Sequence, residues 1–205
     1  KHFEHFVELY NGNAVNKKVL CVTDRDFKWI DDDGKLKSFE AYQNEEVSHI
    51  KKLKDRFAIE NFHICTQTLG GKTFEDELLI ANMDNPDTAK LLFKKAICEG
   101  LEEFFDKYNF DIAAWNTNEK DIDGRFRKVI DKYLKAYKKR IDDNPEKSKL
   151  YEKIIFAELF LHYAKNKKGE VALSLLTDTT LYDEDETTKI VVPDYIREGL
   201  KWLMQ

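Results

Sequence analysis

Two carboxylates follow a short apolar run near the start of the chain. The run KVLCVT ends in Asp24-Arg25-Asp26. Such a run predicts a strand buried in a parallel sheet, and ligands of open parallel sheets bind beyond the carboxyl ends of the strands. Residues two apart in an extended chain point to the same side, so Asp24 and Asp26 can reach one site while Arg25 is directed away. Two close carboxylates repel each other unless a cation lies between them, and hard oxygen ligands suit Mg²⁺ or Mn²⁺.

A second acidic pair follows the next predicted strand, NFHICTQ. In the segment KTFEDELL, Glu75 and Glu77 are again two residues apart. A capping box formed by Thr73 and Asp76 explains the start of a helix here, but it leaves Glu75 and Glu77 without a role. Because they follow the adjacent strand in chain order, they could face the first acidic pair. Two such pairs would suit a two-metal site for phosphoryl transfer, whereas a helix cap or a solvated turn is the simpler alternative for each pair.

The elements that must position these acids predict an α/β fold. Helical spacing over residues 1–11 and 43–57, combined with the two strands, gives a βαβ unit. Asp31-Asp32-Asp33-Gly34 predicts a turn, so residues 27–40 are expected to form a polar loop or a small hairpin. The tail contains a strand-like KIVVP and a closing helix, DYIREGLKWLMQ.

Helical periodicity dominates between Gly71 and about residue 168. One helix is predicted to start at Asn85-Pro86, a second to cover 122–142, and a third to start at Asn144-Pro145 and end near Gly169. We therefore predict a parallel-sheet core over residues 1–82, a helical insertion over 83–166 and completion of the core over 167–205.

The helix over 122–142 carries a basic face opposite its apolar stripe. Phosphate contacts could lie on this face, and an ordinary solvated face with Asp131 and Asp142 nearby is the alternative. The residues of this face recur every three or four positions: Arg125, Lys128, Lys132, Lys135 and Lys139.

Composition limits the class of protein. The 205 residues carry a net charge of -5, which argues against a protein that coats nucleic acid generally but allows a local basic face. Cys21, Cys65 and Cys98 form no C-x-x-C pair and are expected to be free thiols of a reducing cytosol. No apolar run approaches the roughly 18 residues of a membrane span, so we expect a cytoplasmic protein without a membrane partner.

Taken together, the motifs resemble a known family. VLCVTDRDF, then KTFEDELLIAN, then NKKGEVALSLL with Lys168-Gly169 and Ala172, and finally VVPDYIREGLKWL occur in the order seen in the TOPRIM domain of OLD-family (overcoming lysogenization defect) nucleases. The resemblance covers nearly the whole chain. It implies a Rossmann-like parallel sheet, although the first strand of the TOPRIM core and its glutamate are absent.

The resemblance also implies metal-dependent DNA cleavage. Asp24 and Asp26 would bind one metal, Glu75 and Glu77 would help to bind a second, and Lys168 would stabilise charge at the scissile phosphate. Glu77 stands where Asp is more usual in the family. The family places an ATP-binding ATPase module upstream, through which subunits associate, so the chain is expected to be the C-terminal nuclease part of a larger ATPase-nuclease in anti-phage defence. Its partners would be DNA, that module and a second copy or a defence-system protein.

Other interpretations stay open. A haloacid-dehalogenase-type phosphatase also places D-x-D at a strand end and would use Asp24 as its nucleophile, but Phe27-Lys28 disfavours it because that family wants Thr or Val at this point. A non-catalytic α/β scaffold would bind metal through the same acids and cut nothing. A primase or topoisomerase shares the D-x-D, but the Lys168-Gly169 segment and the helical insertion fit those enzymes poorly.

Overall fold

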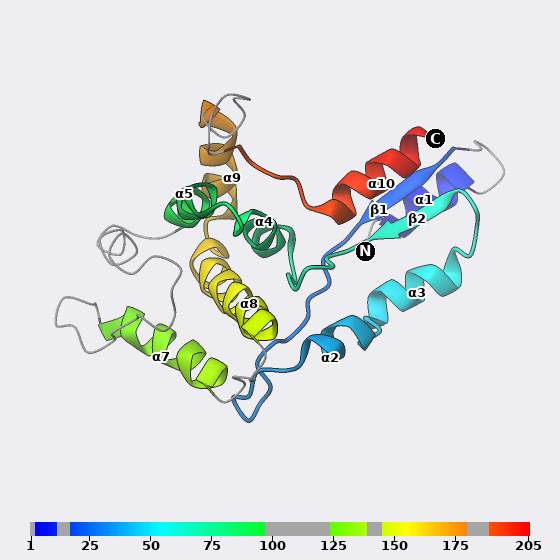
Figure 1. Cartoon of the computed structure of the whole chain (residues 1–205). Helices are drawn as coiled ribbons and strands as arrows, with labels where there is room; N and C mark the ends of the chain where they lie inside the picture. Colours follow the sequence, from blue (N-terminus) through cyan, green and yellow to red (C-terminus); the bar gives the residue numbers. More distant parts are fainter. Residues whose placement is uncertain (1–2, 12–16, 97–123, 139–144, 180–188) are drawn as a thin grey trace.

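The computed structural model describes residues 3–11, 17–96, 124–138, 145–179 and 189–205 (Figure 1). This part of the chain is mixed α/β and mostly helical, with a small parallel sheet. None of its helices is long and apolar enough to cross a membrane. The elements are α1 (Phe3–Asn11), β1 (Val19–Val22), α2 (Phe39–Asn44), α3 (Ser48–Arg56), β2 (Phe62–Cys65), α4 (Phe74–Asn82), α5 (Pro86–Ala96), α7 (Gly124–Lys138), α8 (Pro145–Ala164), α9 (Lys168–Thr177) and α10 (Asp194–Met204).

The two predicted strands pair in parallel, as the strand–helix–strand pattern indicates. Val19 of β1 lies opposite Phe62, and Val22 lies opposite Cys65. The connection contains two short helices, α2 and α3, in place of the single predicted helix over 43–57. β1 is not buried on both faces, because Val22 is 49% exposed. The apolar run therefore predicts the strand correctly but overstates its burial.

Helix α10 packs against this sheet through a glycine. A Cβ atom at Gly199 would lie 2.7 Å from Cys65 Sγ and 3.0 Å from Leu20 Cδ1, so only glycine allows this approach. Cys21 and Cys65 are buried free thiols, as predicted, and Cys98 lies outside the described residues.

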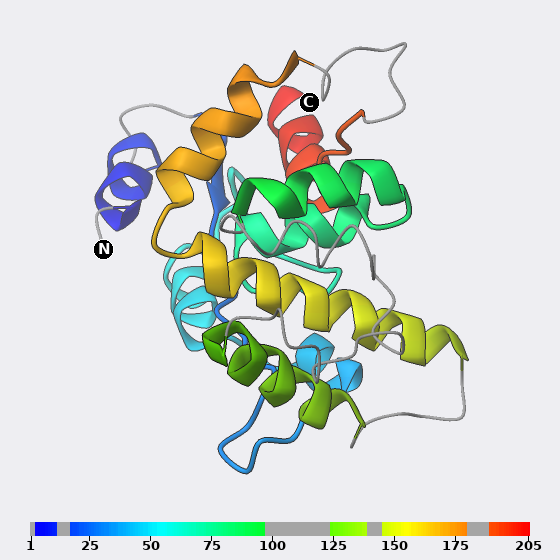
Figure 2. The ribbon, with the colours of Figure 1, turned by 90° about the vertical axis from the view of Figure 1, so that its left-hand side faces the viewer.

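The main hydrophobic core lies among the helices and not at the sheet. Helix α8 packs against α4, α5 and α7, and Figure 2 shows it between α4 and α7. Ile154, Phe156 and Phe160 of α8 belong to the same buried cluster as Trp29 and Tyr42 from the segment after β1. The helices of the predicted insertion and the segment that carries the first acidic pair thus share one core.

Three local predictions need correction. Residues 27–40 form a small hairpin with an Ile30–Leu36 bridge, but the hairpin is not polar, since Phe27 and Trp29 are almost completely buried. The segment KIVVP is not a strand, because the side chain of Asn82 takes the place of a neighbouring strand. Its amide donates to the Val191 carbonyl at 2.9 Å, and its oxygen accepts from the Val191 N–H at 2.7 Å.

The third predicted helix also ends earlier than expected. Helix α8 stops at Ala164, and a new helix, α9, begins at Lys168. This break matters for the site because it places Lys168 in the first turn of a helix, close to the start of α4, to which its side chain bonds.

The two glycines of the C-terminal third should respond to alanine in opposite directions. Gly199→Ala forces α10 away from Cys65, so we expect a loss of roughly 1–3 kcal/mol in the free energy of unfolding. Gly169→Ala adds a Cβ that meets nothing within 4 Å inside helix α9, so it should stabilise by up to about 1 kcal/mol. Urea unfolding of both variants checks this, and a Gly199→Ala chain as stable as the parent would contradict the packing described.

Candidate functional site

The loop that joins β2 to α4 is folded around one buried carboxylate. Glu77 is completely buried and accepts the backbone N–H groups of Thr68 at 2.6 Å, Leu69 at 2.8 Å and Gly71 at 2.7 Å. A Cβ at Gly71 would lie 2.6 Å from Glu77 Cβ, so this loop needs glycine there. Gly70 adopts a φ of 121°, a conformation that side chains disfavour.

These bonds give Glu77 a structural role. Both of its oxygens already accept hydrogen bonds from the loop, and water does not reach it. The spacing of Glu75 and Glu77 predicts that Glu77 helps to bind a second metal. Because its oxygens are taken up by the loop, we do not include Glu77 among the proposed metal ligands. The i, i+2 spacing could not reveal this, because the first turn of a helix turns the two side chains in different directions.

The start of α4 is fixed by the predicted capping box. Asp76 accepts the backbone N–H of Thr73 at 2.8 Å and that of Lys72 at 3.0 Å. Burial raises the pKa of Asp76 to about 7, while these N–H groups act to lower it. Asp76 thus caps the amino-terminal end of α4.

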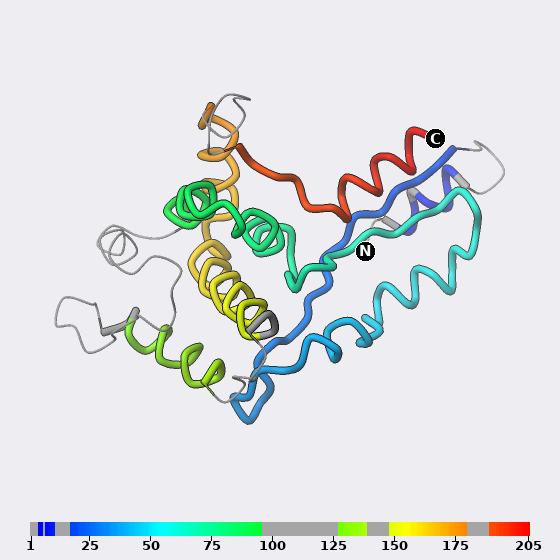
Figure 3. Tube along the Cα trace, viewed as in Figure 1, coloured from blue at the N-terminus to red at the C-terminus, as the bar shows by residue number. Residues whose placement is uncertain are grey.

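Lys72 ties the first acidic pair to this helix. Its carbonyl accepts the backbone N–H of Arg25 at 3.0 Å and that of Asp26 at 2.9 Å. The segment after β1 therefore meets the loop before α4 just beyond the strands, and the two then diverge in the Cα trace (Figure 3). The chain turns at Asp26, whose φ of 55° lies in the left-handed region, and so it is not extended through Asp24-Arg25-Asp26 as predicted.

The side chain of Arg25 points away from the acids, as expected. Its guanidinium lies 4.3 Å from the Tyr42 ring and donates to the carbonyls of Tyr42 and Glu45 at the carboxyl end of α2. A cation at this end of a helix is favoured by the helix dipole. Arg25 therefore holds the loop in place and leaves the acids free of a neighbouring arginine.

Asp24 is half-buried and oriented by neutral donors. It accepts a hydrogen bond from the backbone N–H of Phe74, and its Oδ1 lies 3.4 Å from Gln67 Nε2. Gln67 is completely buried and is itself held by the Arg25 N–H at 2.7 Å and the Tyr195 hydroxyl at 3.2 Å. Burial, with the nearby charges of Glu75 and Asp26, raises the pKa of Asp24, and Lys168 opposes this.

Glu75 is bound by the lysine of the third motif. Lys168 Nζ lies 2.9 Å from Glu75 Oε2, and the Thr73 hydroxyl donates to the same oxygen at 2.8 Å. Although burial acts to raise it, these two hydrogen bonds hold the pKa of Glu75 below its ordinary value. The ion pair joins residues that are 93 positions apart in the sequence, from the starts of α4 and α9.

These residues form one electrostatic cluster, which we call the acid cluster: Asp24, Asp26, Glu75 and Lys168. Its carboxylates are hard oxygen donors of the kind that Mg²⁺ and Mn²⁺ prefer. Within the described residues, no three acidic, histidine or cysteine side chains lie close enough together to hold a metal ion. The ammonium of Lys168 is the cation next to Glu75 in this arrangement.

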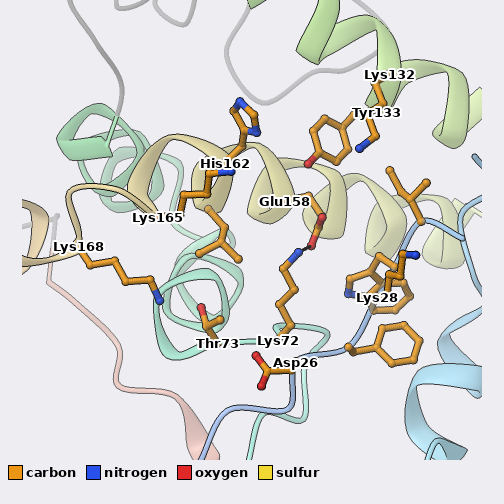
Figure 4. Close-up of a pocket in the computed structure, with 14 residues that line it drawn as sticks. Asp26, Lys28, Lys72, Thr73, Lys132, Tyr133, Glu158, His162, Lys165 and Lys168 are labelled. Carbon is orange, nitrogen blue, oxygen red and sulfur yellow. Dashed lines mark ion pairs between the residues drawn. The ribbon is translucent and has the colours of Figure 1, made fainter. Parts of the chain in front are cut away.

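Three residues of the predicted basic face, Lys128, Lys132 and Lys135, are exposed on α7. Of these three, Lys132 also lines a pocket beside the acid cluster (Figure 4). The side chain of Arg125 and the whole of Lys139 lie outside the described residues.

Sequence reasoning missed several residues near the acids. Gln67 could have been found, because it follows β2 as Asp24 follows β1. Lys72 and Glu158, whose side chains pair at 2.6 Å, and Lys165, which lines the pocket, give no such signal, because each is a single charge that belongs to no motif.

Comparison with known proteins adds no relative. No protein family matches this chain, and neither does any curated protein or solved structure. A function must therefore be argued from the motifs of the chain and the geometry of the acid cluster.

Substitution of the two glutamates of α4 by glutamine should lower the free energy of unfolding by clearly different amounts. Glu77→Gln replaces one of the two acceptor oxygens by an NH₂ group, which faces a loop N–H that it cannot accept, so the free energy of unfolding should fall by roughly 2–3 kcal/mol. Glu75→Gln loses a partly exposed ion pair and should cost less than about 1 kcal/mol. Urea unfolding measures both. A Glu77→Gln chain that keeps its stability but no longer binds Mn²⁺ would restore Glu77 as a ligand.

Proposed function

We propose that this chain is the nuclease domain of a metal-dependent DNA endonuclease of the TOPRIM type. The observation that supports it most is the convergence of Asp24, Glu75 and Lys168, one from each of the three motifs of the resemblance. They come from the segment after β1, the first turn of α4 and the first turn of α9. Three segments far apart in sequence thus contribute two acids and one cation to the same place.

Asp24, Asp26 and Glu75 are the side chains that would hold Mg²⁺ or Mn²⁺. The set is all carboxylate, which suits one such ion, and Asp24 is already oriented by Gln67 and the Phe74 N–H. Since the three side chains do not lie close enough together to hold an ion in this structure, binding would have to draw them together. Because Glu77 accepts three N–H groups of the loop, we propose one ion at this site in place of the predicted two. When bound, the cation would neutralise phosphate oxygens and lower the pKa of a bound water.

The residues of the chain would have distinct tasks in cleavage. Asp24 would fix the position of the site relative to the sheet, because its backbone and side chain are both hydrogen-bonded. Asp26 is exposed at the edge of the pocket, where an incoming strand can meet it. Lys168, 39% exposed, would leave Glu75 and stabilise the negative charge that develops on the phosphate.

The resemblance adds a biological setting to this proposal. The chain would be the C-terminal part of a cytoplasmic ATPase-nuclease, with ATP bound by an upstream module and with phage or mobile DNA as the target. Association of subunits, or with a defence-system protein, would occur through that module.

Cleavage of supercoiled plasmid tests the proposal. With Mg²⁺ or Mn²⁺, the longest native chain containing this sequence should nick the plasmid, and Asp24→Asn and Lys168→Gln should each slow nicking by about 100-fold or more. Matched controls are Asp32→Asn and Lys201→Gln, whose side chains are exposed and lie outside the acid cluster, and both should nick at the parent rate.

Two results would contradict the proposal. Nicking that survives both Asp24→Asn and Lys168→Gln would place the activity at another site. Metal binding without cleavage of plasmid, linear DNA or RNA, with or without ATP, would favour the non-catalytic scaffold.

A further inference from the structure

A pocket of about 660 Å³ lies directly beside the acid cluster (Figure 4). It is bounded by the segment after β1, the loop before α4, and one face each of α7 and α8. Asp26 and Lys168 belong to both the pocket and the acid cluster. This volume is typical of ligand sites and is larger than a single phosphate requires.

The lining of the pocket is strongly positive although the chain is negative overall. Two carboxylates, Asp26 and Glu158, face five lysines. The net charge of the whole chain is -5, so this clustering is opposite in sign to the average surface. A concave site with an excess of one charge attracts ligands of the other sign. The lysines are Lys28, Lys72, Lys132, Lys165 and Lys168.

Two of these lysines are available for a ligand. Lys28 pairs with Asp32, Lys72 with Glu158, and Lys168 with Glu75. Lys132 and Lys165 have no carboxylate partner within the described residues, and both are exposed. Their charges reach the same histidine: burial first, and then Lys165 and Lys132, lower the pKa of His162.

Contacts of Glu158 join the elements that line the pocket. The side chain of Glu158 is only 8% exposed, pairs with Lys72 at 2.6 Å and is hydrogen-bonded to the Tyr133 hydroxyl. Figure 4 shows Lys72 extending from the loop toward Glu158 on α8. Tyr133 is buried and directly follows Lys132 on α7, so α7 and α8 are held together beneath the two available lysines.

We propose that this pocket binds a backbone phosphate of the nucleic-acid strand, next to the phosphate at the acid cluster, with Lys132 and Lys165 as its contacts. This inference rests on the nuclease function proposed above. It takes one lysine from the predicted basic face of α7 and adds one from the turn that follows α8. Continuity through Asp26 and Lys168 lets a single strand contact both the pocket and the acid cluster.

Binding without cleavage tests the inference. A fluorescein-labelled oligothymidylate is titrated with the longest native chain in EDTA, for the parent, Lys132→Gln and Lys165→Gln. Each variant should bind severalfold more weakly, and the slope of log affinity against log salt should fall in magnitude by about 0.7 per lysine. Lys135→Gln is the matched control, since it removes an exposed lysine from the same helix outside the pocket.

The pKa of His162 gives a second measurement, by NMR titration. A bound phosphate offsets the charges of Lys165 and Lys132, so the oligonucleotide should raise this pKa in the parent and less so in Lys165→Gln.

Three results would overturn the inference. Lys135→Gln could weaken binding as much as Lys132→Gln, which would indicate a diffuse basic surface. A second such result is that both pocket variants bind the oligonucleotide as tightly as the parent while plasmid nicking persists, which would leave the nuclease proposal intact. Inorganic tripolyphosphate could bind in the pocket where the oligonucleotide does not, which would make the ligand a free polyphosphate. Binding that depends on Lys132 and Lys165, without nicking of plasmid, would support the phosphate site in the pocket and contradict the nuclease proposal.

Discussion

The buried carboxylate of Glu77 is the interaction on which the rest of the site depends. Three backbone N–H groups of the loop before α4 converge on it, and a buried charge of this kind is stable only when it is fully hydrogen-bonded. Carbonyls of the same loop accept hydrogen bonds from the aromatic core: the Trp29 indole N–H donates to Gly70 at 2.6 Å, and the Tyr42 hydroxyl donates to Gly71 at 2.8 Å. The loop is thus locked to α4 on one side and to the aromatic core on the other.

The acid cluster and the pocket are both connected to this loop. The Lys72 carbonyl holds the backbone that carries the first acidic pair, and the Lys72 side chain reaches Glu158 on α8. Helix α4 starts where the loop ends, so Glu75 lies near enough to Asp24 for its charge to act on that carboxylate, and Lys168 completes the cluster from α9. The acid cluster and the lysines of the pocket thus adjoin each other and share Asp26 and Lys168. A polyanion that needs a cation for chemistry and positive charge for binding suits this arrangement.

The sequence predicts the parts of the site that depend on local chemistry. An apolar strand followed by D-x-D, and a Thr73–Asp76 capping box, can be recognised from neighbours in the chain, and the structure contains both. The sequence does not predict which carboxylate becomes buried, because Glu75 and Glu77 look alike until the loop folds around one of them. The missing KIVVP strand is a similar case, because a single distant side chain, Asn82, satisfies Val191. The role of Lys165 depends on how the turn after α8 is placed beside α7, which no local pattern encodes.

Titration with Mn²⁺, followed by electron paramagnetic resonance, tests the central claim most directly. If Asp24 and Glu75 form a cation site at which Lys168 is the present counter-ion, Asp24→Asn should weaken Mn²⁺ binding at least tenfold. Lys168→Gln should instead strengthen it, because the ammonium no longer competes for Glu75 or repels the ion. Mn²⁺ affinity that is unchanged by Asp24→Asn, or lowered by Lys168→Gln, would contradict the account.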